Sequence, residues 1–189
     1  LEPERLKKQW KEIDSLRKHF KIRIFRGIES DILGDGKLDY PDSILSQFDF
    51  VIGSVHSRFK MAEKEMTARI HRAMENKYLT FVGHPTGRLI LARDPYPVNL
   101  QKLIDAANKL DVIMELNANP HRLDLDWRMC RYAKEKKVPV SINPDAHSTE
   151  GLKDVTYGVG IARKGGLEKK DVINTLPFSA VEKLLKKRK

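Results

Sequence analysis

Four separate stretches of this chain join an apolar β-strand pattern to a side chain that binds metal ions well. The stretches are FRGIES, FDFVIGSVH, YLTFVGH and VPVSINPDAH, and they bring in Glu29, His56, His84 and the pair Asp145 and His147. In a βα barrel the side chains at the carboxyl ends of the strands converge on one face. Carboxylates and imidazoles gathered there suit divalent cations such as zinc, manganese or iron. The pattern therefore predicts a metal site at one rim of an α/β fold.

Helix and strand patterns alternate along the whole chain. It opens with an amphipathic helix whose apolar stripe runs from Leu6 to Phe20, and it closes with a helix from about Phe178. Strands separated by helices imply parallel βαβ units. We expect strands at 22–33, 48–55, 79–83, 112–118 and 138–143, a further strand at 157–163 (YGVGIAR), and helices at 62–76, 98–110 and 124–136, with short helices after the turn DGKLDYP and after His147.

Length and composition fit a single domain that spans residues 1–189. With 40% apolar and 33% charged residues, the chain is typical of a globular protein with a substantial core. No apolar run approaches the roughly 20 residues that cross a bilayer. The single cysteine, Cys130, excludes an internal disulfide and fits a reducing compartment. We therefore expect a cytoplasmic protein, and the opening on Leu1 indicates a piece of a longer polypeptide.

The net charge of +10 lies mostly at the two ends of the chain. Residues 1–26 carry nine basic and four acidic residues, and the last four residues are all basic. The 23 basic and 22 acidic residues between them nearly cancel. Such basic ends either contact phosphate backbones in a salt-dependent way or simply keep the protein soluble, and the sequence leaves both interpretations open.

Each candidate ligand has a structural alternative. Glu29 at the end of an apolar strand needs a cation or a basic partner, and a salt bridge would serve equally well. A lone histidine such as His56 at the end of a strand is often simply hydrogen-bonded. His84 is a stronger candidate because the glycines and Pro85 of VGHPTGR build a tight turn that presents its ring. Asp145 and His147 have the spacing that puts two side chains on one side of an extended segment.

Other polar residues follow the same strand ends. Glu115, Asn117 and Asn119 alternate and therefore share a face, where they would hydrogen-bond ligands or substrate. His121 and Arg122 follow in NPHRL at the mouth of the expected site. Arg88, after the turn that contains His84, either neutralises a substrate phosphate or forms a structural ion pair.

The ordered motifs GIES, SVHS, GHPTGRL, ELNANPHRLDL and NPDAHS resemble the polymerase and histidinol phosphatase (PHP) domain. The resemblance is closest to the version at the carboxyl end of bacterial and archaeal family X DNA polymerases, and it covers nearly the whole chain. It implies a distorted seven-stranded βα barrel that binds up to three Mn²⁺ or Zn²⁺ ions. It also implies 3′-to-5′ exonuclease and phosphatase activity on DNA 3′ ends in DNA repair, with an upstream polymerase region as partner.

By position, the resemblance makes Glu29 a bridging carboxylate, with His56 and His84 as its companions on one ion. Asp145 would bind a second ion and His147 a third. The chain departs from the family pattern because it begins after the HxH motif of the first strand and the DH motif of the second. We therefore expect a fragment that lacks the first two βα units, in which one metal site can be complete.

Two other functions remain open from the sequence. One is a stand-alone PHP phosphatase that acts on a small phosphate ester. The other is a non-catalytic module that braces a polymerase or retains a metal ion for stability. Comparing a small ester with a DNA 3′ end as substrate separates the first from a nuclease.

Overall fold

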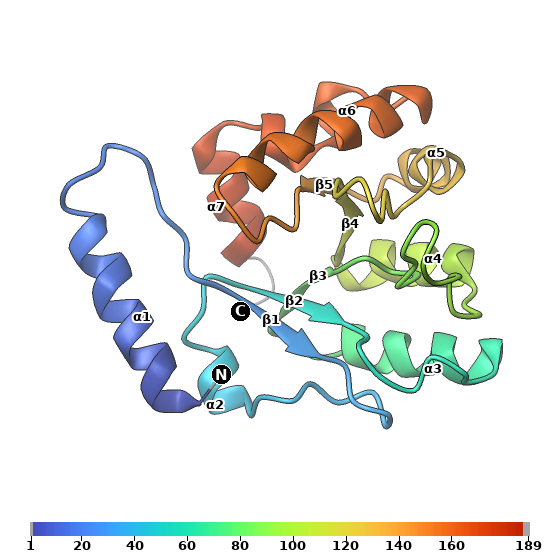
Figure 1. The fold of residues 1–189 in the computed structure, drawn as a ribbon, viewed down its shortest axis with the longest axis horizontal. Helices are drawn as coiled ribbons and strands as arrows, with labels where there is room; N and C mark the ends of the chain where they lie inside the picture. Colours follow the sequence, from blue (N-terminus) through green and yellow to red (C-terminus); the bar gives the residue numbers. More distant parts are fainter. Residues whose placement is uncertain (1, 187–189) are drawn as a thin grey trace.

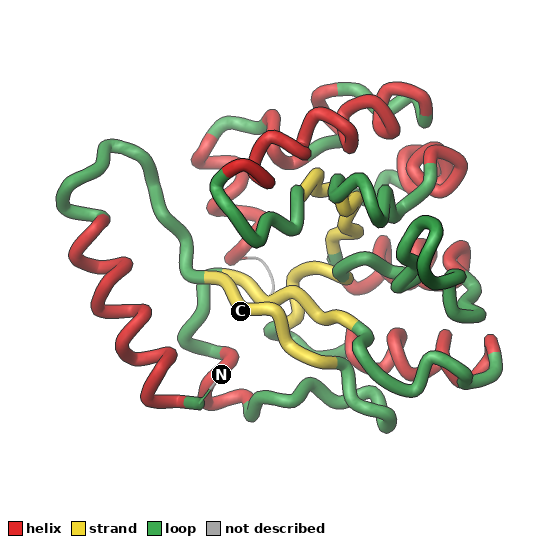
Figure 2. Tube along the Cα trace, in the orientation of Figure 1, coloured by secondary structure: helices red, strands yellow, loops and turns green. Residues whose placement is uncertain are grey.

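Strands that are neighbours in the chain are also neighbours in the sheet. The computed structural model describes residues 2–186, and within them five parallel strands form one sheet in the order β1-β2-β3-β4-β5 (Figures 1 and 2). Because the strands are parallel, their carboxyl ends lie at one edge of the sheet. The strands are β1 (Gly27–Asp31), β2 (Phe50–Ser54), β3 (Leu79–Val82), β4 (Ile113–Asn117) and β5 (Val140–Asn143).

Helices follow the strands and pack against one another in chain order. The helices α3 (Glu63–Met74), α4 (Leu100–Leu110), α5 (Trp127–Glu135) and α6 (Val155–Lys164) form a layer in which each contacts the next (Figure 1). The remaining elements are α1 (Pro3–Leu16), α2 (Asp42–Leu45), α7 (Phe178–Lys186) and the 3₁₀ turns η1 (Glu150–Asp154), η2 (Lys169–Asp171) and η3 (Ile173–Thr175). The chain thus has an α/β fold with helices between parallel strands, as the sequence predicts.

Apolar side chains cover both faces of the sheet. Val51 of β2 belongs to the large core beneath the helix layer, whereas its neighbours Phe50 and Ile52 pack in a second cluster. Successive side chains of a strand point to opposite faces, which explains this division. The second cluster also contains Phe81 of β3 and Leu185 of α7, so α7 closes the face opposite the helix layer.

The prediction of a strand at YGVGIAR is wrong, because this segment lies inside α6. The physical reason is a close approach of α6 to the sheet at Gly158. A Cβ atom placed on Gly158 would lie 2.6 Å from the Cγ2 of Ile142 and 2.7 Å from the Cβ of Ala118. Packing against β5 and the end of β4 therefore outweighs the low helix propensity of glycine and β-branched residues.

The amino-terminal part also differs from its prediction. The first strand is limited to β1, and residues 22–26 are irregular. The opening helix ends at Leu16, and only the early part of its apolar stripe is well covered: Leu6 is 1% exposed and Trp10 packs edge-on against Phe48. Phe20 is 55% exposed.

Arg69 links the segments that follow β1 and β2 through hydrogen bonds. This residue of α3 is 2% exposed. Its guanidinium donates hydrogen bonds to the carbonyls of Leu33 at 2.9 Å and Ser57 at 2.8 Å, and to that of Ile32. A buried charge is tolerated when it is fully hydrogen-bonded. Arg69 thereby fixes the two loops that lead away from the candidate metal ligands.

Within residues 2–186, none of the helices combines the length and the apolar character needed to cross a membrane. Of the four basic residues at the carboxyl end, Lys186 belongs to α7, and residues 187–189 lie outside the described residues.

Candidate metal centre

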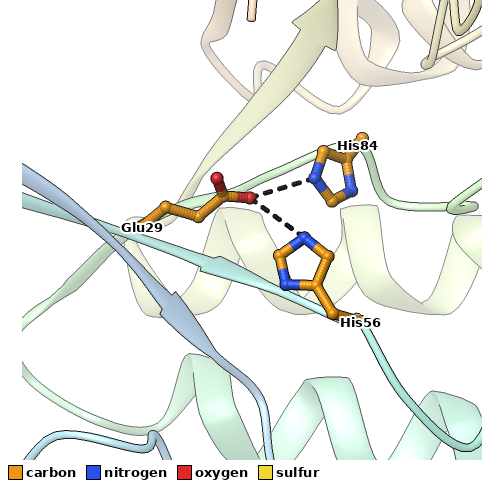
Figure 3. A group of neighbouring side chains, drawn as sticks. All are labelled: Glu29, His56 and His84. Carbon is orange, nitrogen blue, oxygen red and sulfur yellow. Dashed lines mark hydrogen bonds and ion pairs between the residues drawn. The ribbon is translucent and has the colours of Figure 1, made fainter. Parts of the chain in front are cut away.

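Three of the predicted ligands meet at the carboxyl edge of the sheet. Glu29 comes from β1, and His56 and His84 each follow a strand by two residues, β2 and β3 respectively. The Oε1 atom of Glu29 lies 3.0 Å from the Nε2 atom of His84 and 3.4 Å from the Nε2 atom of His56. Figure 3 shows the two rings turned toward this one carboxylate oxygen. Parallel neighbouring strands thus bring together residues that the sequence keeps far apart.

The turn after β3 presses close to β2, which places His84. A Cβ atom on Gly83 would lie 2.4 Å from the Oγ of Ser54 and 2.7 Å from the Cγ2 of Ile52. Glycine is therefore needed for this approach. His84 itself has a positive φ of 22°. The backbone N–H of His84 donates to the Oε2 of Glu115 at 2.6 Å, which holds the unusual conformation.

Burial distinguishes the two histidines. His84 is 3% exposed, and its Nδ1 atom has no hydrogen-bond partner among the described residues. The side chain of His56 is 39% exposed. Packing therefore fixes the ring of His84, whereas the ring of His56 depends on its polar neighbours.

The carboxylates and imidazoles shift one another's pKa values. The hydrogen bond from His84 lowers the pKa of Glu29 to about 2, although burial acts in the opposite direction. Burial opposes the charged form of His84, but the hydrogen bond to Glu29 and the charge of Glu115 outweigh it and raise its pKa. Burial raises the pKa of Glu115 despite the hydrogen bond from Asn143. The centre therefore offers an ionised carboxylate, Glu29, beside a histidine that attracts a proton or another cation.

The donor set fits a divalent metal ion. One ligand atom from each of Glu29, His56 and His84 can be chosen so that all three lie within 4.8 Å of one another. Ligands at about 2.0–2.2 Å from a tetrahedral ion are roughly 3.4 Å apart, close to the distances around Oε1 of Glu29. Two imidazoles and one carboxylate leave a fourth position for water or substrate, as in catalytic zinc sites.

A second polar group surrounds Asp145, which follows β5. The Oδ2 atom of Asp145 accepts hydrogen bonds from the Nε of Arg122 and the Nδ2 of Asn117, both at 3.1 Å. Asn117 is fully buried at the end of β4. A cavity of about 440 Å³ is lined by parts of this group and of the metal centre: its walls include Asn117 and Asp145 as well as Glu29 and His84. The apolar side of the cavity includes Phe50 and Phe81.

The other predicted site residues are not among those that line the cavity, and three of them interact with the backbone. Arg88 donates to the carbonyls of Arg122, at 2.7 Å, and Leu123, so its guanidinium braces the loop after β4. Asn119 accepts a 2.9 Å hydrogen bond from the backbone N–H of His121 within the same loop. The side chain of His147 is 85% exposed, and its Nδ1 lies 2.9 Å from the carbonyl of Asp145. In the described structure, His147 does not join the cluster around Glu29.

Glu115 was expected to hydrogen-bond ligands or substrate, and it accepts a hydrogen bond from the backbone N–H of His84. One residue at the centre, Asp31, was not among the predicted site residues. Asp31 hydrogen-bonds to His56 through the Nδ1 atom at 2.5 Å. Asp31 stands two residues after Glu29 on one strand, so it shares the face of Glu29 and could have been found from that spacing.

Comparison with known proteins agrees with the motifs. No protein-family model matches the chain. The chain is 46% identical over 188 residues to the DNA polymerase/3′-5′ exonuclease PolX of Bacillus subtilis, covering 99% of this chain and 33% of that protein. It is 25% identical over 178 residues to a probable phosphatase of Thermoanaerobacter sp., covering 89% of this chain and 70% of that protein.

A probable phosphatase of Clostridium acetobutylicum is 27% identical over 140 residues, which is 69% of this chain and 55% of that protein. This chain thus spans a third of the length of the Bacillus relative and about two thirds of the Thermoanaerobacter one. The resemblance predicted from the motifs is confirmed: the chain is homologous to part of a bacterial PolX polymerase/exonuclease and to PHP-type probable phosphatases.

Proposed function

We propose that this chain is the phosphoesterase part of a family X DNA polymerase, which hydrolyses phosphodiester and phosphomonoester bonds at DNA 3′ ends during repair. The observation that carries the proposal is the cluster of Glu29, His56 and His84 beside an open cavity. The similarity to a polymerase/exonuclease supports the choice of DNA as substrate.

In this proposal Glu29, His56 and His84 hold Mn²⁺ or Zn²⁺ through Oε1 and the two Nε2 atoms. When bound, the cation supplies a water of lowered pKa and a positive charge for the phosphate oxygens. The low pKa of Glu29 keeps its carboxylate ionised as a ligand at neutral pH. Glu115 holds His84 in place through its backbone, so that the ring stays at the cavity wall.

Substrate contacts are assigned to the group around Asp145. Arg122 is one candidate, because its Nε–H donates to Asp145, which lines the cavity, and a guanidinium pairs well with phosphate oxygens. Asn117, Asn119, His121 and Arg88 remain proposed contacts in the surrounding loop.

We further propose that the sheet is the larger part of a distorted seven-stranded βα barrel completed by a longer polypeptide. Sequential parallel strands with a helix layer on one side are the arrangement that such a barrel requires. In the complete domain, Asp145 would bind a second ion and His147 a third. The Oδ2 atom of Asp145 accepts the hydrogen bonds from Arg122 and Asn117, so Asp145 would bind the ion through Oδ1.

Manganese-stimulated release of nucleotides from a 3′-labelled DNA strand tests the proposal in the full natural polypeptide. Glu29→Ala and His84→Ala should each lower the rate at least 100-fold, because each removes a ligand of the same ion. His71→Ala is the matched control, since His71 is an exposed residue of α3 that pairs with Glu75. Unchanged nucleotide release in Glu29→Ala and His84→Ala would contradict the proposal.

A phosphatase for a small phosphate ester is a second candidate. It is favoured by the similarity to probable phosphatases. The chain matches 70% of the length of the Thermoanaerobacter phosphatase but only 33% of the length of PolX. A mononucleotide-sized ester and a DNA 3′ end should be compared at equal concentration. Faster turnover of the ester, lost in Glu29→Ala, would identify the phosphatase.

A further inference from the structure

His56 lies between two carboxylates of the same strand. Its Nδ1 atom is 2.5 Å from the Oδ1 of Asp31, and its Nε2 atom is 3.4 Å from the Oε1 of Glu29. The two ring nitrogens lie on different edges of the imidazole, and Figure 3 shows the Nε2 edge turned toward Glu29. Asp31 therefore contacts the edge of the ring that faces away from the metal cluster.

The contact determines which nitrogen of His56 carries the proton. An ionised carboxylate has acceptors and no donors, so either ring nitrogen can donate a hydrogen to the carboxylate that it faces. Nδ1 lies 2.5 Å from Asp31, whereas Nε2 lies 3.4 Å from Glu29, so in a neutral ring the shorter contact places the hydrogen on Nδ1 and the lone pair on Nε2. This is the protonation state that a metal ligand at Nε2 needs.

The backbone of Asp31 is itself held in place by the turn that follows β1. Its N–H donates to the Oδ1 of Asp39 at 3.0 Å, and the N–H of Asp39 donates to the carbonyl of Asp31 at 3.0 Å. Asp39 also accepts a hydrogen bond from the hydroxyl of Ser30. The carboxylate of Asp31 thus projects from a fixed backbone.

We propose that Asp31 is a positioning residue of the metal centre, which sets the tautomer and the orientation of the His56 ring without binding the ion. The proposal rests on the metal centre proposed above. His84 needs no such partner because it is 3% exposed, whereas the side chain of His56 is 39% exposed and depends on polar contacts for its orientation. Partners of this kind typically change metal affinity 10–100-fold.

Metal affinity tests the proposal by calorimetric titration of the full natural polypeptide with Zn²⁺ and with Mn²⁺. Asp31→Ala should weaken the tightest site about 10–100-fold. Asp31→Asn should recover part of the loss, because an amide oxygen still accepts from Nδ1. Asp35→Ala should bind like wild type, since Asp35 is an exposed acid of the same turn that bonds to Lys37.

Two further variants distinguish a failure of the proposed metal centre from a failure of the positioning role of Asp31. In a His56→Ala background, Asp31→Ala should cause no additional loss of affinity, because Asp31 acts through His56. An additional loss would overturn the positioning role. If Glu29→Ala leaves affinity unchanged, the metal centre fails and the inference fails with it. If Glu29→Ala abolishes binding while Asp31→Ala binds like Asp35→Ala, the positioning role alone is wrong.

The tautomer of His56 can also be measured in the metal-free wild-type protein. This measurement does not require any variant to fold. Nitrogen NMR in the presence of EDTA should show the neutral ring of His56 as the Nδ1–H form. Predominance of the Nε2–H form would contradict the proposal. Thermal unfolding without metal should be the same for Asp31→Asn and wild type.

Discussion

The Oε1 atom of Glu29 accepts a hydrogen bond of 3.0 Å from the Nε2 atom of His84, which lies 55 positions further along the chain. The two residues come from β1 and from the turn after β3, with β2 lying between these strands in the sheet. His56, which follows β2, completes the cluster. Three consecutive parallel strands therefore build one centre.

Metal addition should stabilise the protein. A ligand that binds only the folded state at 100 times its Kd adds about 2.7 kcal/mol to the free energy of unfolding. Zn²⁺ or Mn²⁺ should therefore raise the Tm, EDTA should reverse the rise, and Glu29→Ala should abolish it. Differential scanning calorimetry measures the change. An equal rise in Glu29→Ala would place the binding site elsewhere.

Metal affinity should fall as the pH falls from 8 to 6. The pKa of Glu29 is about 2, so Glu29 stays ionised over this range and takes up no proton. The hydrogen bond to Glu29 raises the pKa of His84 against the effect of burial, so protons compete with the ion at this ring. Calorimetric titrations at several pH values measure the trend. A Kd that stays constant from pH 8 to pH 6 would mean that no histidine of this cluster binds the ion.

Gly158→Ala should destabilise the protein, whereas Gly160→Ala should not. Both residues lie in α6, where alanine is favoured over glycine by about 1 kcal/mol. At Gly158 the added Cβ would collide with Ile142 and Ala118, whereas at Gly160 no atom lies within 4 Å. Overpacking costs about 1–3 kcal/mol. Urea unfolding should therefore show effects of opposite sign, and equal effects would contradict the close approach of α6.

Arg69→Met should lower the free energy of unfolding by about 1–3 kcal/mol. The change leaves the buried carbonyl of Ile32 without its donor, at about 1–3 kcal/mol for a buried group left unsatisfied, and it also removes the hydrogen bonds to the more exposed carbonyls of Leu33 and Ser57. Arg72→Met is the control from the exposed side of α3 and should change stability by less than about 1 kcal/mol. Urea unfolding of both variants provides the comparison. If both variants change stability by a similarly small amount, the hydrogen bonds of Arg69 do not hold the two loops together.

Much of the sheet could be predicted because its strands are short apolar runs bounded by turn residues. The runs before His56 and His84 are examples, and each lies within about two residues of its predicted position. The YGVGIAR segment could not be assigned in this way. Its glycine and β-branched residues favour a strand, and only the packing of Gly158 against Ile142 explains the helix.

The clustering of Glu29, His56 and His84 could be predicted for a related reason, since carboxyl ends of parallel strands meet at one edge. The pairing of Asp31 with His56 depends on more than that, because it requires the register of β1 on β2, in which Asp31 lies opposite Ser54. The hydrogen bond from Arg122 to Asp145 could not be predicted from the sequence either, since it joins two loops 23 positions apart. Such contacts arise from the folded arrangement of loops, on which local sequence patterns carry no information.

The most direct measurement is a crystal structure of the protein grown with Zn²⁺ or Mn²⁺, with anomalous diffraction recorded at the edge of that metal. The proposed centre predicts a strong peak about 2.0–2.2 Å from the Oε1 of Glu29 and from the Nε2 atoms of His56 and His84. A map with no peak among these three atoms, from crystals whose protein contains the metal, would contradict it.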